Sequence, residues 1–224
     1  MISIKRLDST SRLSIAVTMA VMLTGCSDPA GPVARHPQVD ADASNSLVSS
    51  PASTGPSILR FRRGAPPLEQ RSVSFYATKG KATSVSLYFK SAPSGRRSEY
   101  ARLVIPSGAL AQRPNGTSIG KGDSVLITVS APDPALLLLR MEPHGLKFDA
   151  RSPARLMMRY NEADPDFNGD GTVNVIDALI ELRLSIWRQP TLLDLFTRLA
   201  SILDRSAKSV SADLPGFSQY VIAY

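Results

Sequence analysis

The sequence predicts an all-β protein: an antiparallel β-sandwich over residues 58–224, preceded by a signal peptide and a tether. Short runs in which apolar and polar residues alternate occur throughout this range, and a period of two is typical of strands with one buried face. Turns rich in glycine and proline separate the runs at the spacing expected of a sandwich. No segment offers a long amphipathic helix with clear caps, which also favours strands.

The expected strands follow one another closely along the chain. The turns between them fall at 79–81, 93–95, 114–116, 120–123, 132–134 and 143–145. The apolar positions of the strands are, in order, Val73/Phe75/Ala77, Val85/Leu87/Phe89, Leu103/Ile105, Val125/Ile127/Val129, Leu137/Leu139/Met141, Leu146/Phe148, Leu156/Met158/Tyr160, Ile180/Leu182/Leu184/Ile186, the stretch 196–203, Val210/Ala212/Leu214 and Tyr220/Ile222/Tyr224.

Residues 1–25 have the pattern of a secretory signal peptide. A basic stretch at 1–12 precedes an apolar run at 13–23. The run is shorter than the roughly 20 residues that a membrane-spanning helix needs. It ends in Leu23-Thr24-Gly25-Cys26, which resembles the lipobox of bacterial lipoproteins. The resemblance implies cleavage before Cys26, lipid attachment to its sulfur and, because Ser27 rather than Asp follows, sorting to the outer membrane.

Residues 26–57 are rich in serine, proline, alanine and aspartate and show no strand or helix period, so we interpret them as a disordered tether. Cys26 is the only cysteine, which excludes a disulfide within the chain. With only His36 and His144 beside it, a Cys/His zinc site is excluded as well. No dinucleotide, phosphate-binding or hydrolase motif occurs, and no nucleophile–base pair is recognisable, so we expect no enzyme.

Residues 101–110, Ala-Arg-Leu-Val-Ile-Pro-Ser-Gly-Ala-Leu, carry a resemblance to a known domain. They resemble the strand-and-turn signature of the β-sandwich domain shared by zonula occludens proteins, netrin receptors and ankyrins. Segments 141–148, 155–160 and 216–224 fit later strands of the same domain, the last resembling the closing strand of bacterial lipoproteins built on it. The resemblance implies an interaction or scaffolding unit. Some relatives cut themselves at His-Phe-Ser, but Gly216 stands where that histidine would be, so we expect no cleavage.

Residues 166–177 form the strongest chemical motif. Calcium takes six to eight oxygen ligands, and a twelve-residue loop supplies them at positions 1, 3, 5, 7, 9 and 12, with glycine at position 6. Gly171 occupies position 6, and Val173 at position 8 is expected to point into the fold. A register that starts at Asp164 would place Val175 at position 12, where it cannot ligate. The expected ligands of one structural Ca²⁺ are Asp166, Asn168, Asp170, the Thr172 carbonyl, Asn174 and Asp177.

The final aspartate, where sensor EF-hands carry glutamate, makes this loop resemble that of dockerin modules, which bind cohesin domains. Dockerins carry two such loops, and we find one. A dockerin also needs a helix after the loop. Residues 177–187 can be read as that helix, but the alternation of Ile180, Leu182, Leu184 and Ile186 favours a strand. We therefore expect a calcium loop, with at most one helical turn, joining two strands. A turn without metal remains the alternative.

The formal charge of +7 is unevenly distributed. Residues 58–113 hold eleven Lys or Arg and two acids, whereas residues 161–177 hold five acids and no base. Because the bases are scattered over strands and turns, a solvated face is the simplest interpretation, and contact with anionic headgroups or polysaccharide is the functional one. Nucleic acid is not expected outside the cytoplasm.

Together these features predict a lipid-anchored, non-catalytic protein of the bacterial cell envelope. Its β-sandwich would serve an interaction or structural role, with a protein or envelope polysaccharide as partner, and would be stabilised by one calcium ion. The alternative is a dockerin-like adaptor that binds a cohesin-type partner.

Overall fold

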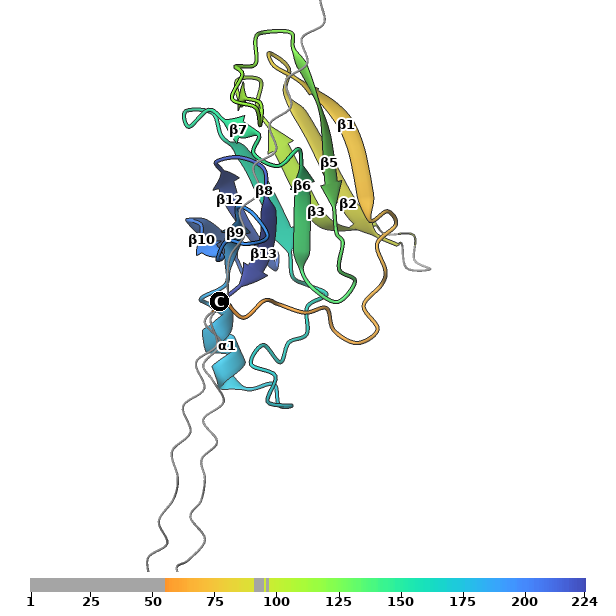
Figure 1. Ribbon diagram of the computed structural model, residues 1–224. Helices are drawn as coiled ribbons and strands as arrows, with labels where there is room; N and C mark the ends of the chain where they lie inside the picture. The colour runs from red at the N-terminus through yellow and green to blue at the C-terminus, as the bar shows by residue number, and fades with distance from the viewer. Residues whose placement is uncertain (1–54, 91–94, 96) are drawn as a thin grey trace, which may run out of the picture. The chain divides into compact units, whose positions relative to one another are not determined.

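The computed structural model describes residues 55–90, 95 and 97–224 (Figure 1). The predicted signal peptide, Cys26, nearly all of the tether and most of the turn at 93–95 lie outside these residues. Within them, the predicted all-β class is confirmed, because antiparallel sheets pack together and only one short helix occurs.

The larger sheet has six strands in the order β1-β5-β6-β13-β9-β10, and every neighbouring pair is antiparallel. Its last strand in the sequence, β13, lies in the interior between β6 and β9 (Figure 1). The strands are β1 (Ser72–Thr78), β5 (Ser124–Ser130), β6 (Leu138–Glu142), β13 (Gln219–Ala223), β9 (Ser185–Gln189) and β10 (Thr197–Arg198).

The smaller sheet has five antiparallel strands in the order β11-β12-β8-β3-β2, and a short pair, β4 with β7, stands apart. The predicted stretch 196–203 is divided between the two larger sheets, since β10 and β11 form their respective edges. The strands are β11 (Ser201–Asp204), β12 (Ser209–Leu214), β8 (Ala154–Arg159), β3 (Ser98–Ile105) and β2 (Thr83–Phe89), with β4 (Leu110–Gln112) and β7 (Lys147–Phe148) in the pair.

One hydrophobic core fills the space between the two sheets. Ile127 and Leu139 from the larger sheet and Leu103 and Leu156 from the smaller one are fully or almost fully buried in it. Tyr100 crosses the core, because its hydroxyl on β3 donates to the Leu138 carbonyl on β6 (3.4 Å). Burial raises the pKa of this phenol, so it stays neutral and keeps its donor.

Strand β13 is buried on both faces. Tyr220 and Ile222 belong to the main core, whereas Val221 and Ala223 form a second cluster on the outer face of the sheet, with Leu138. Partly buried Ile58, Leu136, Trp187 and Phe196 pack against this second cluster. Residues that precede β1 are also joined to this strand, since Ser57 and Tyr224 exchange two backbone hydrogen bonds.

Gly216 lies where two backbones approach closely. A Cβ added there would collide with the Leu146 carbonyl oxygen. The next residue, Phe217, donates its N–H to that same carbonyl (2.8 Å) and stacks edge-on against Phe148. The absence of a side chain at residue 216 therefore has a packing reason of its own.

The prediction of a strand over residues 180–186 is wrong. Residues Val175–Glu181 form α1, which ends at Leu182, and the next strand, β9, begins at Ser185. The reason is local: Asn174 accepts a hydrogen bond as the N-cap, and Asp177 bonds back to the Asn174 N–H, which makes a capping box. Leu182, expected to be buried in a strand, is exposed.

Helix α1 is held to the sandwich by Glu181, whose side chain is almost fully buried. Its carboxylate accepts hydrogen bonds from Tyr160 (2.9 Å), Lys208 (2.5 Å) and Arg205 (3.1 and 3.2 Å). Burial alone would raise the pKa of Glu181, but the bonds from Lys208, Tyr160 and Arg205 together outweigh it and lower the pKa below its ordinary 4.5. The two ion pairs join the helix to the turn between β11 and β12, and the hydrogen bond from Tyr160 joins it to the end of β8.

We predict that Glu181→Gln lowers the free energy of unfolding at pH 7 by about 1–3 kcal/mol. The substitution removes the negative charge that Arg205 and Lys208 contact at a nearly buried position. A carboxyl with a lowered folded-state pKa stabilises the fold above its unfolded pKa and loses that contribution as pH falls through the folded value. The gap between wild type and Glu181→Gln should therefore close as pH falls from about 5 to 3. Urea unfolding across this pH range measures it.

Asp213→Asn is the matched control for this prediction. It removes a carboxylate from the ion pair with Arg155 (2.9 Å), in which both side chains are about half exposed. Exposed pairs contribute about 0–1 kcal/mol. Equal losses in Asp213→Asn and Glu181→Gln would contradict the anchoring role of Glu181.

Candidate functional site

The candidate calcium loop, residues 166–177, leaves the sandwich at Asp164 and returns to it through α1. Its beginning is fixed to the body, since Asp164 N–H donates to the Arg60 carbonyl (2.9 Å) and Tyr224 Oη donates to the Phe167 carbonyl (2.8 Å). The Phe167 side chain packs against the main core. Both ends of the loop are therefore held by the folded domain.

Asp166, at position 1, organises the first half of the loop. Its Oδ1 accepts the N–H groups of Gly169 (2.8 Å) and Asp170 (3.1 Å), and its Oδ2 accepts that of Gly171 (2.7 Å). Gly171 has φ +87°, a backbone conformation that glycine adopts without the strain of a Cβ. The sharp turn predicted at position 6 is thus present.

Asp170, at position 5, lies between the neighbouring predicted ligands. Its Oδ1 accepts from the Thr172 N–H (2.9 Å) and hydroxyl (2.7 Å), and its Oδ2 accepts from the Asn168 amide (2.7 Å). Hydrogen bonds from Thr172 first and Asn168 second lower the pKa of Asp170. This carboxylate is therefore ionised at neutral pH.

Asp177, at position 12, is 2% exposed and joins the two ends of the loop. Its Oδ1 accepts from the Phe167 N–H (2.7 Å), and its Oδ2 accepts from the Asn174 N–H (2.8 Å). Asn174 in turn accepts from the Ile176 N–H (2.7 Å) as the helix cap. The last two predicted ligands thus already have structural partners.

The donor set suits a hard cation such as calcium, since every candidate atom is an oxygen and three candidates are carboxylates. In residues 55–90, 95 and 97–224, however, no three Asp, Glu, His or Cys side chains are grouped closely enough to hold a metal ion as they stand. The oxygens instead accept hydrogen bonds within the loop. Calcium binding would exchange some of these, such as Asn168–Asp170, for metal–oxygen contacts.

The surface of α1 is apolar, which the sequence analysis missed. Val173, expected to point into the fold, is 64% exposed. Four more apolar side chains on or next to the helix are about half exposed or more, and they are Val175, Ile176, Leu179 and Leu182. The spacing of residues 175, 179 and 182 places them on one helical face. The sequence signal for this helix is the pair Asn174 and Asp177, because residues of these types three positions apart fit a capping box as well as metal ligation.

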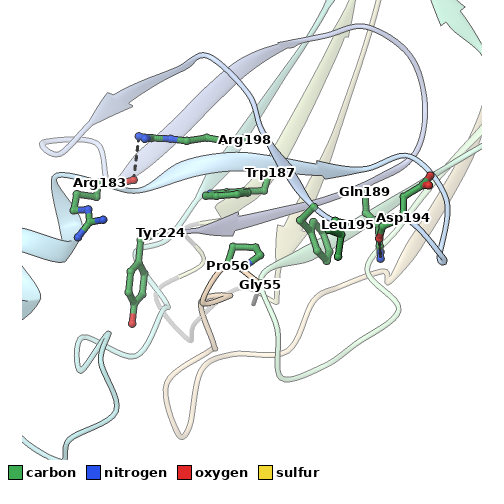
Figure 2. A pocket seen from close by; sticks show the side chains of 10 residues that line it. Gly55, Pro56, Arg183, Trp187, Gln189, Asp194, Leu195, Arg198 and Tyr224 are labelled. Atoms are coloured by element: carbon green, nitrogen blue, oxygen red, sulfur yellow. Dashed lines mark hydrogen bonds between the residues drawn. The ribbon is translucent and has the colours of Figure 1, made fainter. Parts of the chain in front are cut away.

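A second feature is a hollow of about 540 Å³ on the outer face of the larger sheet. Figure 2 shows Arg183 and Arg198 toward one end, Gln189 and Asp194 toward the other, and Trp187 between them. Arg198 Nε donates to Ser185 Oγ (2.8 Å), and Trp187 Nε1 donates to the Ala223 carbonyl (3.2 Å). Gly55 and Pro56 also line this hollow.

Cys26, the predicted lipidation site, lies outside the described residues. Within them, no helix has the length and apolarity needed to cross a membrane. Comparisons with known proteins found no similarity: no protein-family model, no curated protein and no solved structure matches this chain.

Proposed function

We propose that this chain is a lipid-anchored, non-catalytic protein of the bacterial cell envelope. Its β-sandwich serves as an interaction or structural module, stabilised by one calcium ion in the loop 166–177. The observation that carries the proposal is the combination of a lipobox-like end to the signal segment with a folded domain that begins some thirty residues later.

The distance between Cys26 and the domain supports the anchor. Backbone pairing with the rest of the fold begins at Ser57, so residues 27–56 separate it from the cysteine. If these residues form the tether predicted from their composition, its root-mean-square end-to-end distance would be about 30 Å. A domain tethered in this way stays close to the membrane and can still reach a partner.

We predict that Cys26→Ser abolishes acylation. The serine hydroxyl is not the thiol that the lipid-transfer step uses, so the variant should leave the membrane fraction or accumulate as an uncut precursor. Incorporation of a labelled fatty acid and fractionation of cells measure the two effects. A processed Cys26→Ser chain that still sediments with membranes would show that the anchor is elsewhere.

The calcium proposal is supported by the loop itself. Three carboxylates, at Asp166, Asp170 and Asp177, are distributed around a turn whose position 6 is glycine. Only three carboxylate ligands, with aspartate rather than glutamate at position 12, favour weak calcium binding, with a dissociation constant on the order of 10⁻⁴–10⁻³ M. At about 1 mM calcium and a dissociation constant of about 0.1 mM, binding would stabilise the fold by roughly 1.4 kcal/mol. Calcium would then be a structural cross-link rather than a switch.

We predict that millimolar calcium raises the melting temperature of the wild-type chain by several degrees relative to chelator. Asp170→Asn should remove most of this difference, because it deletes a ligand charge while keeping the side-chain size. Asp164→Asn is the matched control, since it removes a charge from the same acidic segment outside the twelve-residue register. Asp177→Ala is less informative because it also removes a cap of α1.

Thermal melts with calcium and with chelator, on wild type and both variants, decide the matter. Identical melts for the wild type under the two conditions would mean that the loop is an acidic turn without metal. A calcium effect that Asp164→Asn removes as fully as Asp170→Asn would assign it to general charge screening.

A dockerin-like adaptor is the second candidate function. The specific observation in its favour is that a capped helix follows the loop and exposes an apolar face, as a protein-docking helix does. The single loop remains a departure from the two-loop dockerin pattern.

The adaptor function predicts calcium-dependent capture of the chain by immobilised cohesin domains. Leu179→Arg should then abolish capture, because it places a charge in the centre of the apolar face. Leu126→Arg, at an exposed leucine on β5, is the matched control. Absence of capture in calcium across representative cohesins would leave the first function standing alone.

A further inference from the structure

The turn between β9 and β10, residues 190–196, presents leucines to the solvent. Leu192 is 63% exposed, Leu193 is 98% exposed and Leu195 is 77% exposed. Three large aliphatic side chains at the tip of one hairpin are unfavourable in water, since transfer of apolar surface out of water is favourable. The following residue, Phe196, packs inward against the second hydrophobic cluster. The exposed leucines therefore project from a base that is itself packed.

The turn is held in shape by its own hydrogen bonds. Gln189 donates to the carbonyls of Asp194 (2.9 Å) and Leu192 (3.5 Å). The Thr191 N–H donates to Asp194 Oδ2 (2.8 Å), and the Asp194 N–H donates to the Thr191 carbonyl (3.1 Å). The Leu193 N–H donates to Thr191 Oγ1 (3.3 Å).

These hydrogen bonds reduce the number of free backbone polar groups that the turn would bring to a lipid surface. A backbone that enters a lipid surface must satisfy its polar groups without water. Pro190 has no N–H, and the N–H groups of residues 191, 193 and 194 are already bonded within the turn. The tip therefore exposes apolar side chains, while several of its backbone N–H groups are already hydrogen-bonded within the turn.

The hairpin is also basic. Residues 182–200 contain Arg183, Arg188 and Arg198 and a single acid, Asp194. Among the described residues, none of these arginines lies within ion-pair distance of a carboxylate, and Asp194 is occupied in the turn. Arg183 and Arg198 line the same hollow as Leu195. Positive charge without a carboxylate partner on such a surface matches an anionic lipid surface, where each base near the headgroups adds attraction.

The residues that lead from Cys26 into the sandwich also reach this hollow. Gly55 and Pro56 line the hollow together with Asp194, Leu195 and Phe196 (Figure 2). The segment that leads back to Cys26 thus joins the domain on the side of the leucine turn. A chain anchored through Cys26 would be held to the bilayer from this side.

We propose that the leucine turn, Leu192, Leu193 and Leu195, contacts the lipid surface and orients the anchored domain on it. The orientation rests on the proposed anchor at Cys26, because the turn alone supplies only a small apolar area. The leucines enter the boundary between headgroups and acyl chains, and Arg183 and Arg198, which line the same hollow as Leu195, face the anionic headgroups. Binding through the turn fixes which face of the sandwich remains free for a partner.

The test uses residues 27–224, which lack Cys26 and retain the whole buried core, drawn from residues 59–223. Leu193→Cys then provides a single cysteine for an environment-sensitive fluorophore. Vesicles of phosphatidylethanolamine and phosphatidylglycerol (3:1) should shift its emission to the blue, and lipids that carry a quencher should dim it. The same label at Ile202→Cys, a position on β11 that is 63% exposed, should not respond.

Sedimentation with the same vesicles gives the energetic readout. Leu192→Ser and Leu193→Ser should each lower the partition coefficient by about tenfold, whereas Ile202→Ser should leave it unchanged. The serine variants should melt as the wild type does, because the replaced side chains are outside the core. Omitting phosphatidylglycerol or adding salt should weaken binding through the arginines.

An unresponsive label at residue 193, with equal sedimentation of all variants, would overturn the proposal. So would a wild-type chain that dimerises without lipid and becomes monomeric in Leu193→Ser, since the turn would then bind a second copy. Neither result bears on acylation, because the tested chain lacks Cys26. The anchor fails separately, if wild-type Cys26 incorporates no lipid.

Discussion

Strand β13 is paired on both edges and buried on both faces, and the two hydrophobic clusters depend on it. Tyr220 and Ile222 complete the core between the sheets, while Val221 and Ala223 support the outer cluster with Trp187. The same strand lies between β6 and β9, so β13 alone pairs the hairpin β9–β10 with the other strands of the larger sheet. The hollow lies over the outer face of this strand, where Trp187 and Phe196 pack against the cluster of Val221 and Ala223.

Helix and loop form one unit because Asp177 serves both. Its carboxylate caps α1 through Asn174 and closes the loop through Phe167. At the other end of the helix, Glu181 connects to Tyr160, Arg205 and Lys208 on the sandwich. A cation bound by Asp177 would therefore act on the position of the helix, and the apolar face of α1 would be presented in a fixed orientation.

Much of the fold could be predicted from the sequence, because period-two alternation records which face of a strand is buried. The runs at 73–77, 85–89 and 125–129 became strands of the two sheets. The alternation at 180–186 misled, since those residues belong to the end of a helix, a turn and the start of β9. The informative residues were Asn174 and Asp177, whose spacing fits a helix cap as well as a metal loop.

For the candidate site, the sequence predicted the turn at Gly171 but not the hydrogen bonds that its carboxylates make. Aspartate and asparagine side chains bond equally well to nearby N–H groups and to a cation, so residue type alone does not separate the two roles. The exposed leucines at 192–195 were also beyond reach, because an apolar residue in a sequence is expected to be buried. Their exposure follows from the tertiary position of a short edge hairpin.

The central position of β13 makes formation of the larger sheet depend on one strand. Without residues 219–223, β6 and β9 would have no strand between them, and the larger sheet would consist of two separate parts, β1-β5-β6 and β9-β10. The pairing of β13 with β6 joins residues 219–221 to residues 138–140, and pairings so distant in sequence form slowly. Closure of the larger sheet is therefore expected to be a slow and cooperative step of folding.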